Sequence, residues 1–299
     1  MSQEKTDERL GFIGLGVMGE PMCRNLAVKA GRRVLAYDRR AEPLRRLAPD
    51  VVAQRSLAGV TGGADVIFLS LPGAPEVRAV CLGPDGLVAL ARPGQVVIDC
   101  STVPVALARE LAGAFTARGA HFADAPVART RQAAIDGTLS IMVGGDMFLF
   151  HRIEPLLRCM ASDVTHCGPA GAGQAVKLLN NMVLSITVVA LAEALAVAKA
   201  SGAVDPKVLF DTLAKGSADS FALRNHGMNS LLPEDHPPQA FPVSYMLKDV
   251  SYAIVLARGA GLDLQGAGTA RRLLEETAAA GLADAYHTAL IEAVRRHRV

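Results

Sequence analysis

Residues 10–19 read LGFIGLGVMG, an apolar run followed by Gly14, Gly16 and Gly19. The apolar run predicts a buried strand, and the residues from Gly19 to about Ala30 predict the helix that follows it. Glycines at this spacing permit a tight turn and let the backbone approach a pyrophosphate, whose charge then lies at the positive end of the helix. Glycines that serve only tight packing would leave the same pattern. The order of strand, turn and helix favours a dinucleotide-binding fold.

A second β-rich run, RVLAY (33–37), ends next to Asp38. A carboxylate at this place would bond both ribose hydroxyls of the adenosine and would repel a 2′-phosphate, so Asp38 favours NAD. Arg39 and Arg40 argue the other way, because arginines just past this strand can hold a 2′-phosphate, although an exposed basic pair is often only solvated surface. We therefore expect NAD, count Arg39 among the cofactor-binding candidates and keep NADP as the alternative.

Short β-rich runs alternate with helical runs through the first half of the chain, which indicates a parallel sheet flanked by helices. The β-rich runs are 10–13, 33–37, 65–69, 95–99, 121–124 and 139–143. From about Gly173 only helical patterns continue, with breaks at Gly202, near Gly216, across the Pro-rich stretch 232–242, and at Gly261 and Gly281. We expect an α/β protein with an N-terminal Rossmann-type doubly wound sheet (1–170). A C-terminal all-α domain (171–299) should begin with a long interdomain helix.

The composition excludes several classes of protein. The 299 residues carry a net charge of +2 with no long run of one sign, which argues against a nucleic-acid partner. The first residues, MSQEKTDERL, lack a signal-peptide pattern, and five cysteines without CxxC spacing suit a reducing compartment. We therefore expect a cytoplasmic protein that holds no metal. The apolar stretch 182–192 is about half the length of a membrane span, so we expect a buried helix and no membrane partner.

Two further motifs, SLPG (70–73) and DCSTVP (99–104), each lie where a predicted strand ends. Ligands of open α/β sheets bind at this edge, so both motifs are candidates for contact with the nicotinamide end of the cofactor. Thr102 also fits a second interpretation, because Ser or Thr before a Pro-led helix is a good N-cap.

The segment GAGQAVKLLNNM (171–182) opens a long helix that is apolar on nearly every side. Burying an unpaired charge or amide costs several kcal/mol, so its lysine and asparagines need partners. Lys177 and Asn181 are four residues apart and share a face, whereas Asn180 is turned away. At that place Lys177 can donate a proton to a carbonyl oxygen as hydride arrives, and can remove it in the oxidative direction. Alternatively, Lys177 lies in the first turn and extends its amine to water.

The chain resembles the β-hydroxyacid dehydrogenase family over almost its whole length. The motifs above occur in the order and spacing of that family, together with three more: DAPV (124–127), GTLSIMVGG (137–145) and YMLKDV (245–250). That family includes 3-hydroxyisobutyrate dehydrogenase, tartronate semialdehyde reductase and 4-hydroxybutyrate dehydrogenase. The resemblance implies hydride transfer between a nicotinamide cofactor and a small hydroxy acid. It also implies that Lys177 is the catalytic acid/base and Asn181 its orienting partner. The cofactor contacts that it implies are Gly14, Leu15, Gly16, Val17, Met18, Gly19, Asp38, Leu71, Pro72, Thr102 and Lys248.

One departure concerns the substrate: where most of the family reads DAPVSGG, this chain reads DAPVART (124–130). Arg129 offers a planar fork of donors that suits a carboxylate, a sulfonate or a phosphate. The 3-sulfolactaldehyde reductases form a branch that is similar in this turn, since they read glycine, arginine, threonine here, and they work with NADH. That branch, however, has a serine shortly after the residue that matches Asn181, whereas this chain has Met182 to Leu184 there. Arg129 and Arg131 also fit solvated loop residues.

We expect the substrate to be a small anionic hydroxy acid or its semialdehyde, with 3-sulfolactaldehyde and succinic semialdehyde as alternatives. The substrate-binding candidates are Ser101, Arg129, Thr130 and Asn180. Further alternatives are an imine-reducing relative and a non-catalytic cofactor-binding or chromatin-associated relative of the same fold. These relatives look different at the position of Lys177. By analogy with the family, the apolar interdomain helix indicates a homodimer or homotetramer.

Overall fold

The computed structural model describes residues 8–238 and 241–297, which divide into two compact units, one ending at Lys177 and one beginning at Leu178. The start of the chain, on which the expectation of no signal peptide rests, lies outside the described residues at positions 1–7. Residues 239 and 240 of the Pro-rich stretch 232–242 also lie outside them.

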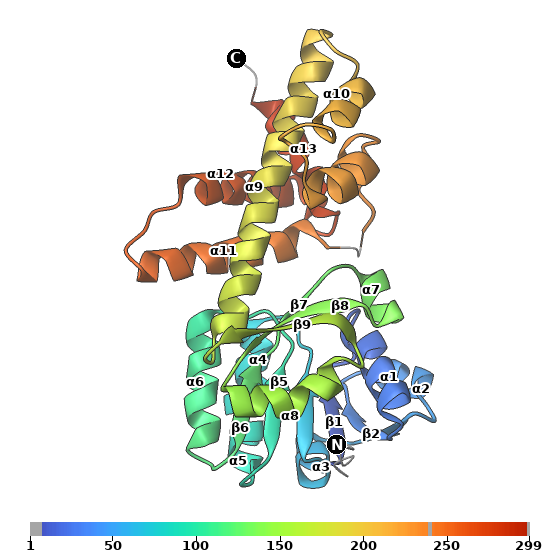
Figure 1. Cartoon of the computed structure of the whole chain (residues 1–299), viewed down its shortest axis with the longest axis vertical. Coiled ribbons are helices and arrows are strands. Elements are labelled where there is room, and N and C mark those ends of the chain that lie inside the picture. Colours follow the sequence, from blue (N-terminus) through green and yellow to red (C-terminus); the bar gives the residue numbers. More distant parts are fainter. Residues whose placement is uncertain (1–7, 239–240, 298–299) are drawn as a thin grey trace. The chain divides into compact units, whose positions relative to one another are not determined.

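The first unit contains one sheet, with nine strands in the described part of the chain (Figure 1). The strands are β1 (Leu10–Ile13), β2 (Val34–Tyr37), β3 (Val51–Ala53), β4 (Val66–Leu69), β5 (Val96–Asp99), β6 (His121–Asp124), β7 (Val127–Ala128), β8 (Leu139–Gly144) and β9 (Ala161–Gly168). Their order is β3-β2-β1-β4-β5-β6-β8-β7, with β9 paired to β8. The strands from β3 to β6 are parallel, which confirms the Rossmann-type doubly wound sheet.

The far edge of the sheet differs from the expectation of a purely parallel sheet. Strand β8 runs antiparallel to β6 and β7, and parallel to β9. Three strands have no counterpart among the β-rich runs of the sequence. Strands β3 and β7 are only three and two residues long, and β9, ASDVTHCG, is polar and largely outside the core, so none of them produces a recognisable apolar pattern.

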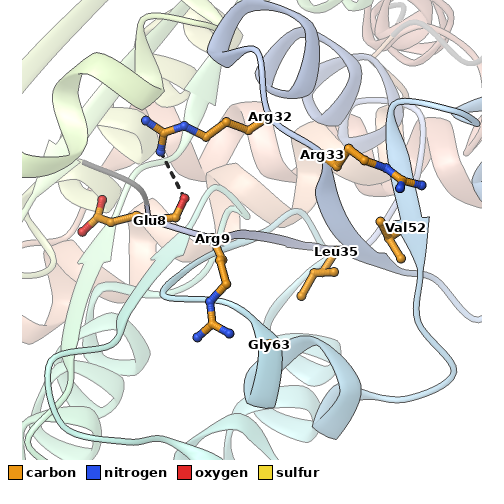
Figure 2. Close-up of a pocket in the computed structure, with 7 residues that line it drawn as sticks. All are labelled: Glu8, Arg9, Arg32, Arg33, Leu35, Val52 and Gly63. Carbon is orange, nitrogen blue, oxygen red and sulfur yellow. Dashed lines mark hydrogen bonds between the residues drawn. The ribbon is translucent and has the colours of Figure 1, made fainter. Parts of the chain in front are cut away.

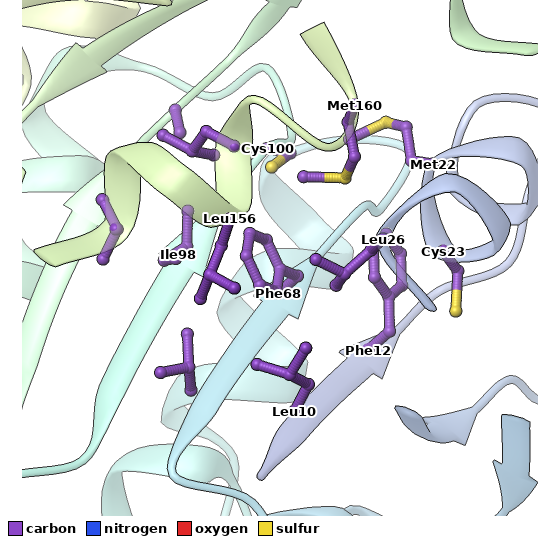
Figure 3. Packing of buried hydrophobic residues seen from close by; sticks show 14 of the residues in the cluster. Leu10, Phe12, Met22, Cys23, Leu26, Phe68, Ile98, Cys100, Leu156 and Met160 are labelled. Atoms are coloured by element: carbon purple, nitrogen blue, oxygen red, sulfur yellow. The ribbon is translucent and has the colours of Figure 1, made fainter. Parts of the chain in front are cut away.

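Helices cover both faces of this sheet and bury a separate core on each. They are α1 (Gly19–Ala30), α2 (Ala41–Arg46), α3 (Leu57–Gly63), α4 (Ala74–Leu82), α5 (Leu87–Leu90), α6 (Val105–Thr116), α7 (Arg131–Asp136) and α8 (Met147–Leu157). Phe12 and Phe68 stack within the core that α1 and α8 cover (Figure 3). Ile13 and Leu69 point to the other core, beneath α3 to α6. Because the central strands are buried on both faces, they appear in the sequence as continuous apolar runs.

Helix α9 (Ala172–Ser201) begins in the first unit and continues into the second. By length and composition it could cross a membrane, and 44% of its most apolar window is buried. A core helix has the same properties, and Val188, Ala192 and Leu195 of α9 belong to the core of the second unit. Its ending at Ser201, before Gly202 with φ +62°, confirms the break predicted there.

The described part of the second unit is helical, as expected. Its elements after α9 are α10 (Pro206–Leu213), η1 (Leu223–Leu231), α11 (Val243–Gly259), α12 (Gln265–Thr277), η2 (Ala278–Leu282), η3 (His287–Leu290) and α13 (Ile291–Arg296). Phe210, Met246 and Leu274 lie in one buried cluster with the residues of α9. The predicted breaks at Gly261 and Gly281 coincide with left-handed glycines.

Candidate active site

The glycine turn between β1 and α1 has room for a side chain at Gly16, but not at Gly14 or Gly19. A Cβ on Gly14 would collide with the carbonyl oxygen of Ser70, and a Cβ on Gly19 would collide with that of Gly14. Gly16 has no atom within 4 Å of the place where its Cβ would lie. Helix α1 begins here without a side-chain cap, although the N–H of Glu20 donates to the carbonyl oxygen of Gly16 at 3.1 Å and Pro21 has no N–H. An open face beside an uncapped helix start suits a phosphate group.

The other residues of the turn differ in what they present to a ligand. The side chain of Leu15 is 1% exposed and belongs to the core, so only its backbone can reach a cofactor. The side chain of Met18 packs against the same core, whereas Val17 is half exposed.

Asp38, at the end of β2, is bonded to the glycine turn. Its Oδ2 accepts the N–H of Leu15 at 2.7 Å, and its Oδ1 accepts the N–H of Arg40 at 2.8 Å. Arg40 Nε lies 3.3 Å from the same Oδ1, while Arg39 is exposed. Oδ1 thus accepts two donors from Arg40, whereas Oδ2 keeps a second lone-pair position, so the side chain can brace the turn and still accept from a ribose hydroxyl.

The loops after β4 and β5 are joined through Ser101. The Oγ of Ser101 accepts the N–H of Leu71 at 2.9 Å, and the residue is 3% exposed. The structure therefore shows Ser101 bracing the two loops, and its contact with substrate stays a prediction. Pro72, next in the SLPG loop, is exposed.

Thr102 is half-buried and lies two residues before the N-cap residue of the following helix. Helix α6 begins at Val105, and its N-cap residue is Pro104, which offers no side-chain cap. The helix therefore begins two residues later than the N-cap interpretation of Thr102 assumed, because Pro104 has φ −58° and ψ 143° and is not yet helical.

The start of α9 is fixed to the carboxyl ends of β5 and β6. Asp124 accepts the N–H groups of Gly171 at 2.6 Å and Gln174 at 2.8 Å. Burial raises the pKa of Asp124, while these N–H groups act in the opposite direction. A Cβ on Gly173 would collide with the carbonyl oxygen of Met142. Helix α9 is thus packed closely onto the sheet one turn before Lys177, which is 7% exposed.

In the second unit, the continuation of α9 carries a buried polar pair. Asn181 Nδ2 donates to Asp249 Oδ2 at 2.7 Å, and both residues are 2% exposed. Asn180 Nδ2 donates to Asn181 Oδ1 at 3.0 Å. On α11, Lys248 Nζ lies 3.5 Å from Asp249 Oδ1. Asp249 is not among the site residues predicted from the sequence. Its place directly after Lys248 in the motif YMLKDV is the feature that could have pointed to it.

The turn of residues 128–130 carries two of the predicted substrate-binding residues, and both make contacts within the protein. Arg129 has a left-handed φ of +84°, and its Nη2 lies 2.6 Å from Asp163 Oδ2. Its Nη1 donates to the carbonyl oxygen of Thr138 and to Ser162 Oγ. The fork expected to bind the substrate is therefore occupied by β9 and its neighbours. Thr130, also expected to bind substrate, caps α7 by accepting the N–H of Ala133.

A cavity of about 260 Å³ lies near the amino ends of the strands, away from the carboxyl ends described above (Figure 2). Arg9, Arg32 and Leu35 contribute to its lining, close to the amino ends of β1 and β2. Ligands of this fold bind at the carboxyl ends of the strands, so this cavity is separate from the candidate active site. Within residues 8–238 and 241–297, no three His, Cys, Asp or Glu side chains are grouped to hold a metal ion.

Comparison with known proteins agrees with this arrangement. Residues 9–168 match the NAD-binding domain of 6-phosphogluconate dehydrogenase, and residues 171–294 match the NAD-binding domain of NADP-dependent 3-hydroxyisobutyrate dehydrogenase. The chain is 33% identical to 2-hydroxy-3-oxopropionate reductase of Escherichia coli, over 96% of this chain and 97% of that one. It is 35% identical to 3-hydroxyisobutyrate dehydrogenase of Pseudomonas aeruginosa, over 94% and 95%. The solved 3-hydroxyisobutyrate dehydrogenase of Mycobacterium tuberculosis superimposes with a TM-score of 0.88 at 34% identity, covering 96% of this chain and 99% of that one.

The chain belongs to the β-hydroxyacid dehydrogenase family. It is an NAD(P)-dependent oxidoreductase of the 3-hydroxyisobutyrate dehydrogenase type that acts on CH–OH groups. The glycine turn fits this cofactor, because the open face at Gly16 admits the pyrophosphate while Gly14 and Gly19 hold the backbone close.

Proposed function

We propose that the protein interconverts a small β-hydroxy acid, or a related anionic primary alcohol, and its semialdehyde. The observation that carries this proposal is the placement of Lys177. It is a buried lysine one turn beyond a helix start that Asp124 fixes to the carboxyl edge of the dinucleotide-binding sheet. Ligands of this fold bind at that edge.

In this reaction NAD(P) supplies the hydride for reduction or accepts it for oxidation. During oxidation, the neutral amine of Lys177 takes the hydroxyl proton while the C–H bond breaks and the carbonyl double bond forms. During reduction, the ammonium gives that proton to the oxygen that becomes an alcohol. The same ammonium stabilises the negative charge that develops on the oxygen.

Asn181 is proposed as the orienting partner of Lys177. The two residues lie one turn apart on α9, so their side chains leave the same face of the helix. Asp249 holds the amide of Asn181 at 2.7 Å and thereby fixes its orientation. Lys248 is the proposed cofactor contact of this unit, and its amine is held beside Asp249 and the ring of Tyr245.

The acid group of the substrate is proposed to lie against the turn of residues 127–130. Because Asp163, Ser162 and Thr138 occupy the fork of Arg129, we assign Arg129 to shaping this turn and the backbone of the turn to binding the acid group. Asn180, beside Asn181, is the remaining candidate for substrate contact. The expected substrates under this assignment are β-hydroxy carboxylates and their semialdehydes. The alternatives to test are 3-sulfolactaldehyde, which bears a sulfonate, and succinic semialdehyde, a carboxylate whose reduction gives a γ-hydroxy acid.

We further propose NAD as the preferred cofactor, a cytoplasmic location and a homodimeric or homotetrameric state, with neither nucleic acid nor membrane as a partner. Asp38 supports NAD. The small net charge supports the absence of a nucleic-acid partner. Val183 and Val197 on α9 are 58% and 65% exposed, which supports a further protein surface packed against this helix.

The proposed function is tested by following absorbance at 340 nm with NADH and NADPH. The panel comprises methylmalonate semialdehyde, tartronate semialdehyde, succinic semialdehyde, 3-sulfolactaldehyde and an uncharged aldehyde of similar size. We expect turnover of at least one acid-bearing aldehyde and a clear preference for it over the uncharged one. Equal activity with the uncharged aldehyde would contradict the proposed substrate class.

A further inference from the structure

Gln174 is a fully buried side chain three residues before Lys177. Its Oε1 accepts the N–H of Val103 at 3.1 Å, and its Nε2 donates to the carbonyl oxygen of Ser101 at 2.7 Å. One amide therefore holds the backbone on both sides of Thr102. All of these residues belong to the unit that ends at Lys177.

Both ends of this connection are themselves held. On one side, Ser101 accepts the N–H of Leu71 through its Oγ and donates its own N–H to Asp99 Oδ1 at 2.9 Å. On the other side, Asp124 binds the N–H groups at the start of α9. Gln174 is thus the side-chain bridge between the loops after β4 and β5 and the first turn of α9.

We propose that Gln174 is a positioning residue for the reaction, because its amide fixes the Thr102 loop against the helix turn that carries Lys177. The inference rests on the proposed function, in which Lys177 transfers the proton and Thr102 lies at the nicotinamide end of the cofactor. Hydride and proton transfer depend steeply on alignment, and a displacement of about 1 Å can cost roughly 100-fold in rate.

The chemistry of the site calls for a primary amide. The N–H of Val103 needs an acceptor, and the carbonyl of Ser101 needs a donor, so one planar group must supply both. Methionine has nearly the same shape but leaves both backbone groups without a partner, which favours movement of the loop. An ionised glutamate would face the carbonyl oxygen of Ser101 with a like partial charge, whereas a protonated glutamic acid would restore one donor and one acceptor.

The experiment compares Gln174→Met with a matched control, Gln95→Met. Gln95 is 1% exposed and donates to the carbonyl oxygens of Thr61 and Ala64 at the amino end of β5, opposite the Thr102 loop. Gln174→Met loses two hydrogen bonds to the backbone, and Gln95→Met loses three, since Gln95 Oε1 also accepts the N–H of Arg92 at 3.4 Å; both variants should therefore lower the unfolding temperature. Rates are divided by the concentration of folded protein, which is determined by titration with NADH.

We expect Gln174→Met to lower kcat by about 10- to 100-fold, with the Kd of NADH changed by less than about threefold. The deuterium isotope effect with C4-deuterated NADH should rise as hydride transfer becomes slower. Gln95→Met should keep kcat within about twofold of the parent. Equal kcat values for the two variants, at equal loss of stability, would overturn the inference.

Gln174→Glu provides a second test that does not depend on the folding of Gln174→Met. Its kcat, relative to the parent at each pH, should rise as the pH falls and the introduced carboxyl group gains a proton to donate to Ser101. A constant ratio across the pH range would overturn the inference. A parent-like Gln174→Met beside an inactive Lys177→Ala would overturn this inference alone, whereas an active Lys177→Ala would overturn the proposed function.

Discussion

Arg129 Nη2 and Asp163 Oδ2 lie 2.6 Å apart, and this ion pair joins the turn after β7 to the start of β9. The two side chains are 41% and 55% exposed, so the pair itself contributes little to stability. Its main effect is to hold Arg129 in the left-handed conformation that glycine adopts more readily. Most of the family that the chain resembles has a glycine at this position, and glycine adopts a positive φ without strain. In this chain, the ion pair with Asp163 holds Arg129 in that conformation instead.

This relationship predicts different outcomes for two substitutions of Arg129. Arg129→Gly restores a residue that accepts φ +84° without strain, so we expect the KM of the acid-bearing aldehyde to stay within about threefold of the parent. Arg129→Val removes the ion pair and places a β-branched residue in a left-handed conformation, so its KM should rise by about tenfold or more. Steady-state kinetics with an acid-bearing and an uncharged aldehyde measures both effects. Loss of acid selectivity in Arg129→Gly would show instead that the guanidinium binds the substrate.

Asp38 should govern the choice of cofactor. Asp38→Asn removes the charge but keeps an acceptor for the N–H of Leu15, so the glycine turn should persist. We expect the preference of the parent for NADH over NADPH to fall by about tenfold, since the like charge facing a 2′-phosphate is gone. The ratio of kcat/KM for the two cofactors measures this change. A parent enzyme that already favours NADPH tenfold would refute the assignment and direct attention to Arg39 and Arg40.

A histidine cluster in the second unit predicts a loss of stability in acid. His287 is fully buried, and within the described residues neither of its ring nitrogens has a hydrogen-bond partner. His226, whose Nδ1 lies 2.6 Å from Tyr286 Oη, packs 5.0 Å away between ring centroids. Burial lowers the pKa of His226 to about 4, and burial followed by the neighbouring histidines lowers the pKa of His287 further below its usual value.

Because these pKa values are lowered on folding, the unfolded chain takes up protons first as the pH falls. The stabilisation is fully present above about pH 6.5, the ordinary pKa of histidine, and is lost as the pH falls toward 4. We expect the unfolding temperature to drop by several degrees between pH 7.5 and 5, and to drop less in His287→Leu. Parallel curves for the parent and His287→Leu would rule out a contribution from His287.

The local part of the fold could be predicted from sequence. Helix α1 at Gly19–Ala30 and strand β6 at His121–Asp124 coincide with their predicted bounds, because glycine spacing and apolar runs act within a few residues. Strand β9 could not be predicted, because its polar sequence is held by pairing with β8 and not by burial.

The candidate site shows the same limit. Sequence could identify Lys177 as a lysine in an apolar helix that needs a partner. It could not identify Asp163 as the partner of Arg129, or Asp249 as the partner of Asn181, because those residues lie 34 and 68 positions away. The role of Gln174 could not be predicted either, because its side chain bonds to the backbone of Val103 and Ser101, which lie 71 and 73 positions earlier.

The central claim is that Lys177 transfers the proton to and from the reacting oxygen. The most direct measurement is single-turnover oxidation of NADH at 340 nm by Lys177→Ala, with the substrate preferred in the aldehyde panel and with the Kd of NADH measured beside it. We expect a rate at least about 100-fold below that of the parent and a Kd of NADH within about threefold of the parent value. A hydride-transfer rate within a few-fold of the parent would contradict it.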